Sequence, residues 1–456
     1  MARVVNSEKQ CMANPLKMSQ AIGAALAFMG VDRAMPLLHG SQGCTSFGLV
    51  LFVRHFREAI PLQTTAMSEV ATVLGGFDNV EQALVNIANR TKPAFIGICT
   101  TGVSEIKGDD LNGFLKQIRL SHPELDSIAL VDVSTPDFQG AFQDGWAAAV
   151  TRMVEDLVEV PLVETRLSRR INVLPGCHIT PGDIDELRDI FEAFSLEPLF
   201  LPDLSGSLDG HVPQEFTPTT LGGISIEQIR KMGSARATVA IGEQMRGAAI
   251  TLEHRTGVPH TLFGRLTGLA ANDELMSFLA GISGVPVPKK YRRQRSQLVD
   301  AMLDGHFHFG GKKIALAAEP DLLSTLAHWL HEMGCEIQAA VTTTESPVLE
   351  RIPAEEVLLG DLDDLEQRAA GADLLVTHSH GRQAAERLGI PFFRAGIPTF
   401  DRLGAAHQVT VGYRGTRDLI FNIGNLLMAN THEPTPETWM PHQQSSHRPV
   451  SLQLPQ

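Results

Sequence analysis

Ala94-Phe95-Ile96-Gly97-Ile98-Cys99 is a short, almost wholly apolar run, and Ser127-Ile128-Ala129-Leu130-Val131-Asp132-Val133 is a second one. Between them, residues Leu111 to Leu120 repeat apolar side chains at helical spacing. Apolar runs of this length are typical of strands in a parallel sheet, because helices cover both faces of such a sheet. The three segments together predict a β-α-β unit.

The same alternation of strand and helix patterns recurs along almost the whole chain. A second set of predicted strands and helices lies in the middle of the sequence, and a third set lies nearer the end. Repeated units of this kind predict an α/β protein with about three doubly wound, Rossmann-like parallel sheets. The predicted strands are 171–176, 197–202, 237–242, 313–317, 336–341 and 372–377, and the predicted helices include 183–194, 320–333 and one ending at Leu388.

Domain limits are predicted where the alternation lapses. Glu159 to Arg170 contains Pro161 and several arginines and is typical of a linker, and Pro286 to Arg293 opens a long charged helix. After about residue 430 the chain is polar and rich in proline and histidine, which predicts a flexible tail. The predicted division is an N-terminal domain 1–165, a middle domain 166–300, a C-terminal domain 301–430 and a tail 431–456.

Composition excludes several classes of function. The 456 residues carry a formal net charge of -14, which argues against binding to nucleic acid. The longest nearly unbroken apolar stretch, Ala21 to Val31, is far shorter than the roughly 18 residues that a membrane-spanning helix needs. The first nine residues include both acidic and basic side chains where a secretion signal would be apolar. We therefore expect a cytoplasmic protein that does not enter a membrane.

The five cysteines are widely spaced and form no C-x-x-C pair, which argues against a disulfide framework and a self-contained metal site. Cys44 differs from the others because it lies in Pro36-Leu37-Leu38-His39-Gly40-Ser41-Gln42-Gly43-Cys44-Thr45, where a strand is expected to pass into a helix. The start of a helix favours a thiolate, which binds metal or attacks an electrophile. One thiolate cannot hold a metal cluster alone. Cys44 is therefore either a nucleophile or a ligand whose companions lie on another chain.

Other polar residues allow both a structural and a chemical interpretation. His39 could form a thiolate dyad with Cys44, or it could simply pack at the end of its strand. His378 and His380 follow a predicted strand, where they could bind metal or line a crevice between domains. Cys177, at the end of another strand, is either buried or a ligand. The segment Arg54 to Glu58 is either a solvated helix end or a charged docking surface.

Six stretches, taken in order along nearly the whole chain, resemble the beta-type chains of the nitrogenase component 1 family. They are His39 to Cys44, Arg54 to Glu58, Thr100 to Leu111, Thr135 to Gly140, Leu201 to His211 and Arg394 to Arg402. The resemblance implies the nitrogenase component 1 architecture. In catalytic beta chains of that family three cysteines bind the large P-cluster, and here the corresponding positions are Ser19, Cys44 and Gly102.

Because two of those three ligands are absent, the resemblance is to the branch of the family that assembles the iron-molybdenum cofactor. It implies that Cys44 ligates a 4Fe-4S cluster shared with an alpha-type partner chain, NifE, with two copies of each chain in the complex. No catalytic residue is implied here. The resemblance implies a scaffold with an electron-relay role rather than a stand-alone enzyme.

The same resemblance implies how the complex works. An iron-sulfur precursor arrives from NifB or a carrier, is held mainly by NifE, and is matured with molybdenum and homocitrate delivered by the nitrogenase iron protein. Two alternatives stay open. One is a beta-type subunit of a related reductase, either nitrogenase component 1 itself or dark-operative protochlorophyllide reductase. The other is an enzyme that uses Cys44 and His39 as nucleophile and base.

Overall fold

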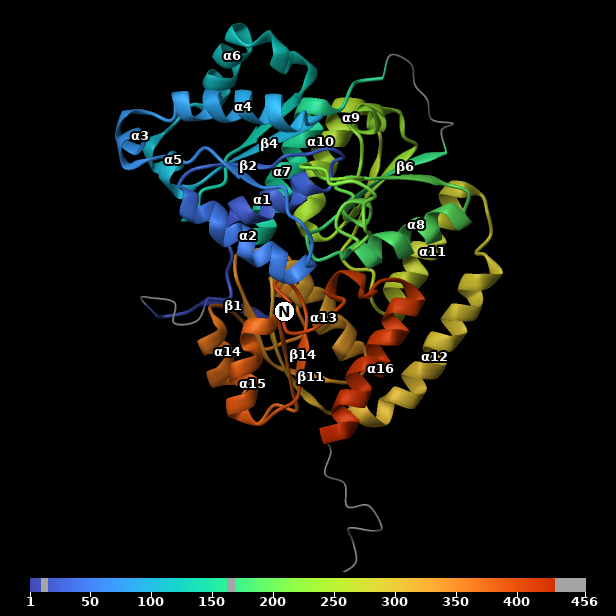
Figure 1. The fold of residues 1–456 in the computed structure, drawn as a ribbon. Helices are drawn as coiled ribbons and strands as arrows, with labels where there is room; N and C mark the ends of the chain where they lie inside the picture. The colour runs from blue at the N-terminus through green and yellow to red at the C-terminus, as the bar shows by residue number, and fades with distance from the viewer. Residues whose placement is uncertain (10–14, 162–168, 431–456) are drawn as a thin grey trace, which may run out of the picture.

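Three all-parallel sheets, each covered by helices, form the protein in the computed structural model (Figure 1). The structure describes residues 1–9, 15–161 and 169–430. The predicted α/β class with three doubly wound sheets is confirmed. Figure 1 shows the sheets and their helices as three adjoining lobes, coloured blue, green, and orange to red. The predicted tail 431–456 and Cys11 lie outside the described residues.

The first sheet has the strand order β3-β2-β4-β5 and contains the predicted β-α-β unit. β4 pairs with β5 from Phe95 opposite Ala129 to Cys99 opposite Val133, and α6 connects the two strands. The strands are β2 (Leu37–His39), β3 (Gln63–Thr64), β4 (Phe95–Thr100) and β5 (Ala129–Val133), and the helices are α1 (Gln20–Met29), α2 (Gln42–Phe56), α3 (Glu69–Leu74), α4 (Phe77–Thr91), α5 (Gly102–Lys107), α6 (Leu111–Ser121) and α7 (Phe142–Leu157).

The second sheet has the order β7-β6-β8-β9, and its two central strands are apolar and almost fully buried, as parallel strands under helices should be. Its strands are β6 (Arg170–Pro175), β7 (Glu197–Phe200), β8 (Ala237–Ile241) and β9 (His260–Phe263), and the helices of this region are α8 (Pro181–Ala193), α9 (Ile226–Arg230), α10 (Arg246–Thr256) and α11 (Leu269–Ser283).

The third sheet has the order β1-β12-β11-β10-β13-β14, and its edge strand β1 comes from the start of the chain. The long helices α12 and α16 pack side by side at one border of this lobe (Figure 1). Its strands are β1 (Arg3–Asn6), β10 (Lys313–Ala317), β11 (Glu336–Thr342), β12 (Glu356–Leu359), β13 (Leu374–Thr377) and β14 (Phe392–Arg394), and the helices are α12 (Lys289–Phe309), α13 (Pro320–Glu332), α14 (Leu362–Arg368), α15 (Arg382–Leu388) and α16 (Gly412–Asn430).

β1 joins a sheet made otherwise of residues beyond 312, although it lies inside the predicted N-terminal domain. The residue limits of the predicted domains stay a prediction.

The sheets also share one apolar core that runs through all three lobes. Trp146 of α7, for example, is buried and donates a hydrogen bond to the Pro175 carbonyl of β6. Among the described helices, none combines the length and apolar character needed to cross a bilayer.

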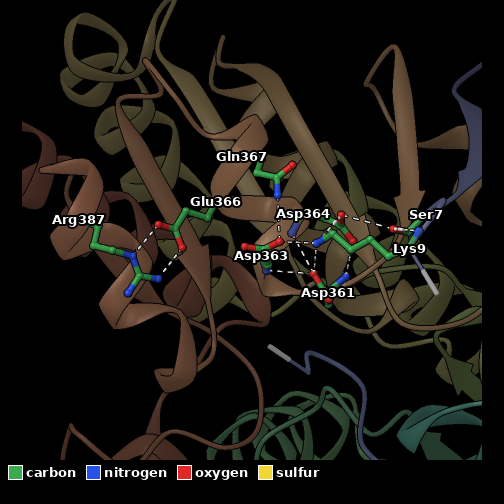
Figure 2. Close-up of polar contacts among 8 residues, drawn as sticks. All are labelled: Ser7, Lys9, Asp361, Asp363, Asp364, Glu366, Gln367 and Arg387. Carbon is green, nitrogen blue, oxygen red and sulfur yellow. Dashed lines mark hydrogen bonds and ion pairs between the residues drawn. The ribbon is translucent and has the colours of Figure 1, made fainter. Parts of the chain in front are cut away.

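An ion cluster fastens the N-terminal segment to the third sheet (Figure 2). The Lys9 amino group lies 3.1 Å from Asp361, 2.5 Å from Asp363 and 2.9 Å from Asp364, at the first turn of α14. Burial opposes the charge on Lys9, but the three carboxylates outweigh it and raise the lysine pKa. The Asp361 side chain is almost fully buried, so its ion pair with Lys9 contributes more to stability than an ion pair on the surface would.

Replacing Lys9 with glutamine is expected to lower the free energy of unfolding by about 1–3 kcal/mol, because the charge that faces three carboxylates is lost. Arg3→Gln is the matched control. Arg3 pairs with Glu356 of the same sheet but its side chain is 76% exposed, so its loss should cost less than about 1 kcal/mol. Urea denaturation of the two variants compares the effects, and equal midpoints for both variants would contradict the account.

Candidate metal-ligand site at Cys44

Cys44 occupies the first turn of α2, directly after the short buried strand β2. Ser41 precedes the helix in extended backbone conformation, and its hydroxyl oxygen lies 3.6 Å from the Cys44 sulfur. The thiol is partly exposed. The predicted strand-to-helix position is therefore confirmed, and it places a reachable sulfur at the positive end of a helix dipole.

The turn before Cys44 is held against the start of α5. A Cβ atom on Gly40 would lie 2.3 Å from the Thr101 hydroxyl oxygen, so no larger residue fits there without movement. The Thr101 and Ser104 hydroxyls each donate a hydrogen bond of 3.0 Å to the His39 carbonyl. These contacts fix the first turn of α2 beside the first turn of α5.

Ser19 and Gly102 also lie at helix starts. Ser19 precedes α1, and Gly102 is the first residue of α5. The Gly102 N–H donates a 2.9 Å hydrogen bond to Asp137, and the side chain of Gln20 donates one of 2.9 Å to the carbonyl of Gln139. Both helix starts thus contact the loop 134–141.

The two nitrogens of the His39 ring lie beside residues other than Cys44. The imidazole is fully buried, with one ring nitrogen 3.0 Å from the Thr65 hydroxyl and the other 3.1 Å from the Asp109 carboxylate. Burial is the main reason that its pKa is lowered, against the opposite influence of Asp109. Since both ring nitrogens are engaged, the structural interpretation of His39 holds and the arrangement does not favour a thiolate dyad.

The other described thiols are buried and protonated. Cys99, Cys177 and Cys335 have negligible exposure, and desolvation raises the pKa of each thiol, that of Cys335 to about 12. Within residues 1–9, 15–161 and 169–430, no three histidine, cysteine or carboxylate side chains are grouped as metal ligands. On this part of the chain Cys44 therefore belongs to no group of three or more metal ligands.

Exposed apolar side chains gather on the elements around Cys44. Phe47 and Val50 follow it along α2, and the others lie on α3, on α5 and in the loop that contacts Gly102. α2, α3 and α5 share one flank of the molecule (Figure 1). We call these residues the apolar patch, and their exposed fractions are 62% for Phe47, 57% for Val50, 78% for Val73, 80% for Ile106 and 59% for Phe138.

The apolar patch is not among the sequence-based predictions, although α2 carries a signal for it. Residues 47 to 53 of this helix are apolar on every side. A helix of that kind is usually buried all round, whereas this one buries only its inner face within the chain. Such exposed patches mark surfaces that bind another molecule.

The segment Arg54 to Glu58 joins α2 to the other two lobes. The Arg54 guanidinium stacks 3.8 Å from the ring centre of Phe400, and the Arg57 guanidinium donates a 2.9 Å hydrogen bond to the Phe400 carbonyl. Glu58 accepts a 2.8 Å hydrogen bond from the Gly210 N–H. These side chains therefore make contacts within the chain. Neither of the two sequence-based alternatives, a solvated helix end or a docking surface, predicts such contacts.

His378 and His380 lie in the loop after β13, at the predicted strand end. The two rings are 5.3 Å apart, and the His380 ring is 5.1 Å from that of Phe400. His378 accepts a hydrogen bond from the His380 N–H, and burial lowers the pKa of its ring to about 4. The pair packs where the third lobe meets α2, which fits the interpretation as residues of a domain crevice.

Comparison with known proteins places this arrangement in a family. Residues 19–428 match the family described as nitrogenase component 1 type oxidoreductase. The nitrogenase iron-molybdenum cofactor biosynthesis protein NifN of Bradyrhizobium diazoefficiens is 62% identical over 96% of this chain and 95% of its own. NifN of Mesorhizobium japonicum is 56% identical over 97% of this chain and 96% of its own.

A solved structure, "Nitrogenase Cp1 at pH 6.5", shares the fold with a TM-score of 0.89 and 32% identity, over 95% of this chain and 97% of the other. Both the sequence relatives and the solved structure thus match almost the entire length. The chain belongs to the nitrogenase component 1 family and, within it, to the NifN proteins.

Proposed function

We propose that this chain is one half of a scaffold on which the iron-sulfur precursor of the iron-molybdenum cofactor is matured, and that Cys44 gives one ligand to a 4Fe-4S cluster shared with the alpha-type chain NifE. The observation that carries the proposal is the isolation of Cys44. It is the partly exposed thiol among the described cysteines, and exposed apolar side chains of the apolar patch follow it along its own helix.

The residues around Cys44 fit one corner of such a cluster. A 4Fe-4S cluster takes four ligands, usually thiolates, so three more must come from the partner chain. The helix start favours the negative charge of both the thiolate and the cluster. Ser19 and Gly102 offer no thiol, which is why the proposed cluster is smaller than the P-cluster of catalytic relatives.

The apolar patch supports the proposal that a partner chain binds beside Cys44. Phe47 and Val50 are on the same helix as Cys44, so a chain that covers them also reaches the sulfur. A ligand set divided between two chains links association to metal binding, because the cluster stabilises the paired state alone. When bound, the cluster would supply one-electron transfer between a docked reductase, the nitrogenase iron protein, and the precursor.

The proposed cargo can be tested on the complex. The chain is co-expressed with NifE in cells that contain NifB but lack the catalytic component, and the complex is purified without oxygen. We expect it to carry an iron-sulfur precursor in addition to the shared cluster. After incubation with molybdate, homocitrate and reduced iron protein, it should activate cofactor-free component 1. A complex that carries a tetrapyrrole, or that carries no precursor and activates nothing, would contradict the scaffold function.

A further inference from the structure

Ser41, the residue that precedes α2, does not cap its helix in the common manner. A serine hydroxyl at such a position normally accepts a hydrogen bond from the backbone N–H three residues along the chain. Ser68 and Ser225 do so here, with the N–H groups of Ala71 and Gln228, each at 3.2 Å. Among the described residues, the Ser41 side chain makes no such bond. Its hydroxyl is therefore available to another partner.

The atom beside the Ser41 hydroxyl is the Cys44 sulfur, 3.6 Å from the oxygen. Cys44 is the third residue of α2, so its N–H is the group that a capping serine would engage. The hydroxyl thus faces the side chain of this residue in place of its backbone N–H. With a protonated thiol either atom can donate the hydrogen bond. A metal-bound sulfur is a thiolate that can only accept, so the hydroxyl becomes the donor.

The hydroxyl borders open space on the outer side of the turn. Within the described chain, a Cβ atom placed on Gly43 would approach only the Ser41 hydroxyl, at 3.8 Å. Ser41 and Cys44 are both partly exposed. The contacts of Gly40 with Thr101 hold the backbone of this turn in place. The turn therefore leaves room for a group bound to the sulfur while the hydroxyl stays beside it.

We propose, building on the proposed function, that Ser41 is a positioning residue whose hydroxyl donates a hydrogen bond to the Cys44 thiolate and raises the reduction potential of the shared 4Fe-4S cluster. Reduction adds one electron, and therefore negative charge, to the cluster and its sulfur ligands. A hydrogen bond donated to a ligand sulfur stabilises that added charge, because bonds to charged acceptors are stronger than bonds to neutral ones. Groups that contact a metal ligand in this way also fix its orientation.

The role of Ser41 is tested by redox titration of the shared cluster, followed by electron paramagnetic resonance, in the complex with NifE purified without oxygen. Ser41→Ala is expected to shift the midpoint potential to a more negative value with unchanged iron content. Ser41→Thr keeps a hydroxyl and should restore the potential of the unaltered complex. Ser68→Ala is the matched control, because it removes a hydroxyl that caps α3 and should leave the potential unchanged.

Three results would overturn the role of Ser41 and leave the scaffold function intact. The first is an unshifted potential in Ser41→Ala, and the second is an equal shift in Ser41→Thr or Ser68→Ala, since the hydroxyl beside the sulfur would then not be the cause. The third is loss of iron from Ser41→Ala alone, which would make the hydroxyl a requirement for cluster binding. An unaltered complex without a 4Fe-4S signal, or a signal that survives Cys44→Ala, contradicts the proposed function and the role of Ser41 together.

Discussion

Phe47→Asp is expected to separate this chain from its alpha-type partner, with a loss of affinity of about 30-fold to 1,000-fold. Phe47 is 62% exposed, one turn after Cys44, and lies in the apolar patch. Central aromatic residues contribute about 2–4 kcal/mol to protein interfaces, and a buried carboxylate in their place adds a desolvation penalty. Co-purification of tagged NifE with the variant, followed by size-exclusion chromatography, measures the effect.

Leu120→Asp provides the control for this prediction. Leu120 is 86% exposed near the end of α6 and lies outside the apolar patch, so its substitution should leave association unchanged. The chain itself should stay folded in both variants, because neither side chain belongs to the core, and circular dichroism checks this. An intact complex with Phe47→Asp would show that the partner binds another surface.

Asp183→Ala is expected to destabilise the whole chain by about 3–5 kcal/mol. The carboxylate is fully buried and accepts hydrogen bonds from the backbone N–H groups of Thr180, Thr410 and Val411, at 3.1, 2.5 and 3.1 Å. Burial raises the pKa of Asp183 and these bonds lower it, with burial the stronger influence. Alanine leaves these three backbone donors unpaired between α8 and the segment before α16.

The control for Asp183→Ala is Asp189→Ala in the same helix. The Asp189 side chain is 62% exposed and faces Lys290 at 3.5 Å, a surface pair whose loss should cost less than about 1 kcal/mol. Thermal unfolding of the two variants measures the contrast. If Asp183→Ala melts at the temperature of the unaltered protein, the described contacts do not hold the second and third lobes together.

The fold could be predicted wherever the evidence in the sequence is local. Strands such as Phe95–Thr100 and Lys313–Ala317 are continuous apolar runs, and both were placed within a residue or two. β1 was missed because it is four residues long and mostly exposed, and its pairing partner β12 lies about 350 residues further along the chain. In a segment that short, the sequence alone does not indicate a strand, because the strand depends on pairing with the sheet that it joins.

The features of the candidate site also differ in whether local sequence predicts them. The position of Cys44 at a helix start follows from the glycines and apolar residues around it, and the structure confirms that position. The apolar patch combines residues from α2, α3, α5 and the loop 134–141, so no single local pattern could identify it. The contact between Arg54 and Phe400 is likewise a product of tertiary packing.

The ligand role of Cys44 is tested most directly by iron content and electron paramagnetic resonance of the dithionite-reduced complex with NifE. We compare the unaltered chain, Cys44→Ala, and Cys99→Ala, which removes a buried thiol from β4 of the same sheet. We predict that Cys44→Ala loses or alters the signal of the shared 4Fe-4S cluster, with a matching fall in iron, while Cys99→Ala keeps both. An unchanged spectrum and iron content in Cys44→Ala would contradict it.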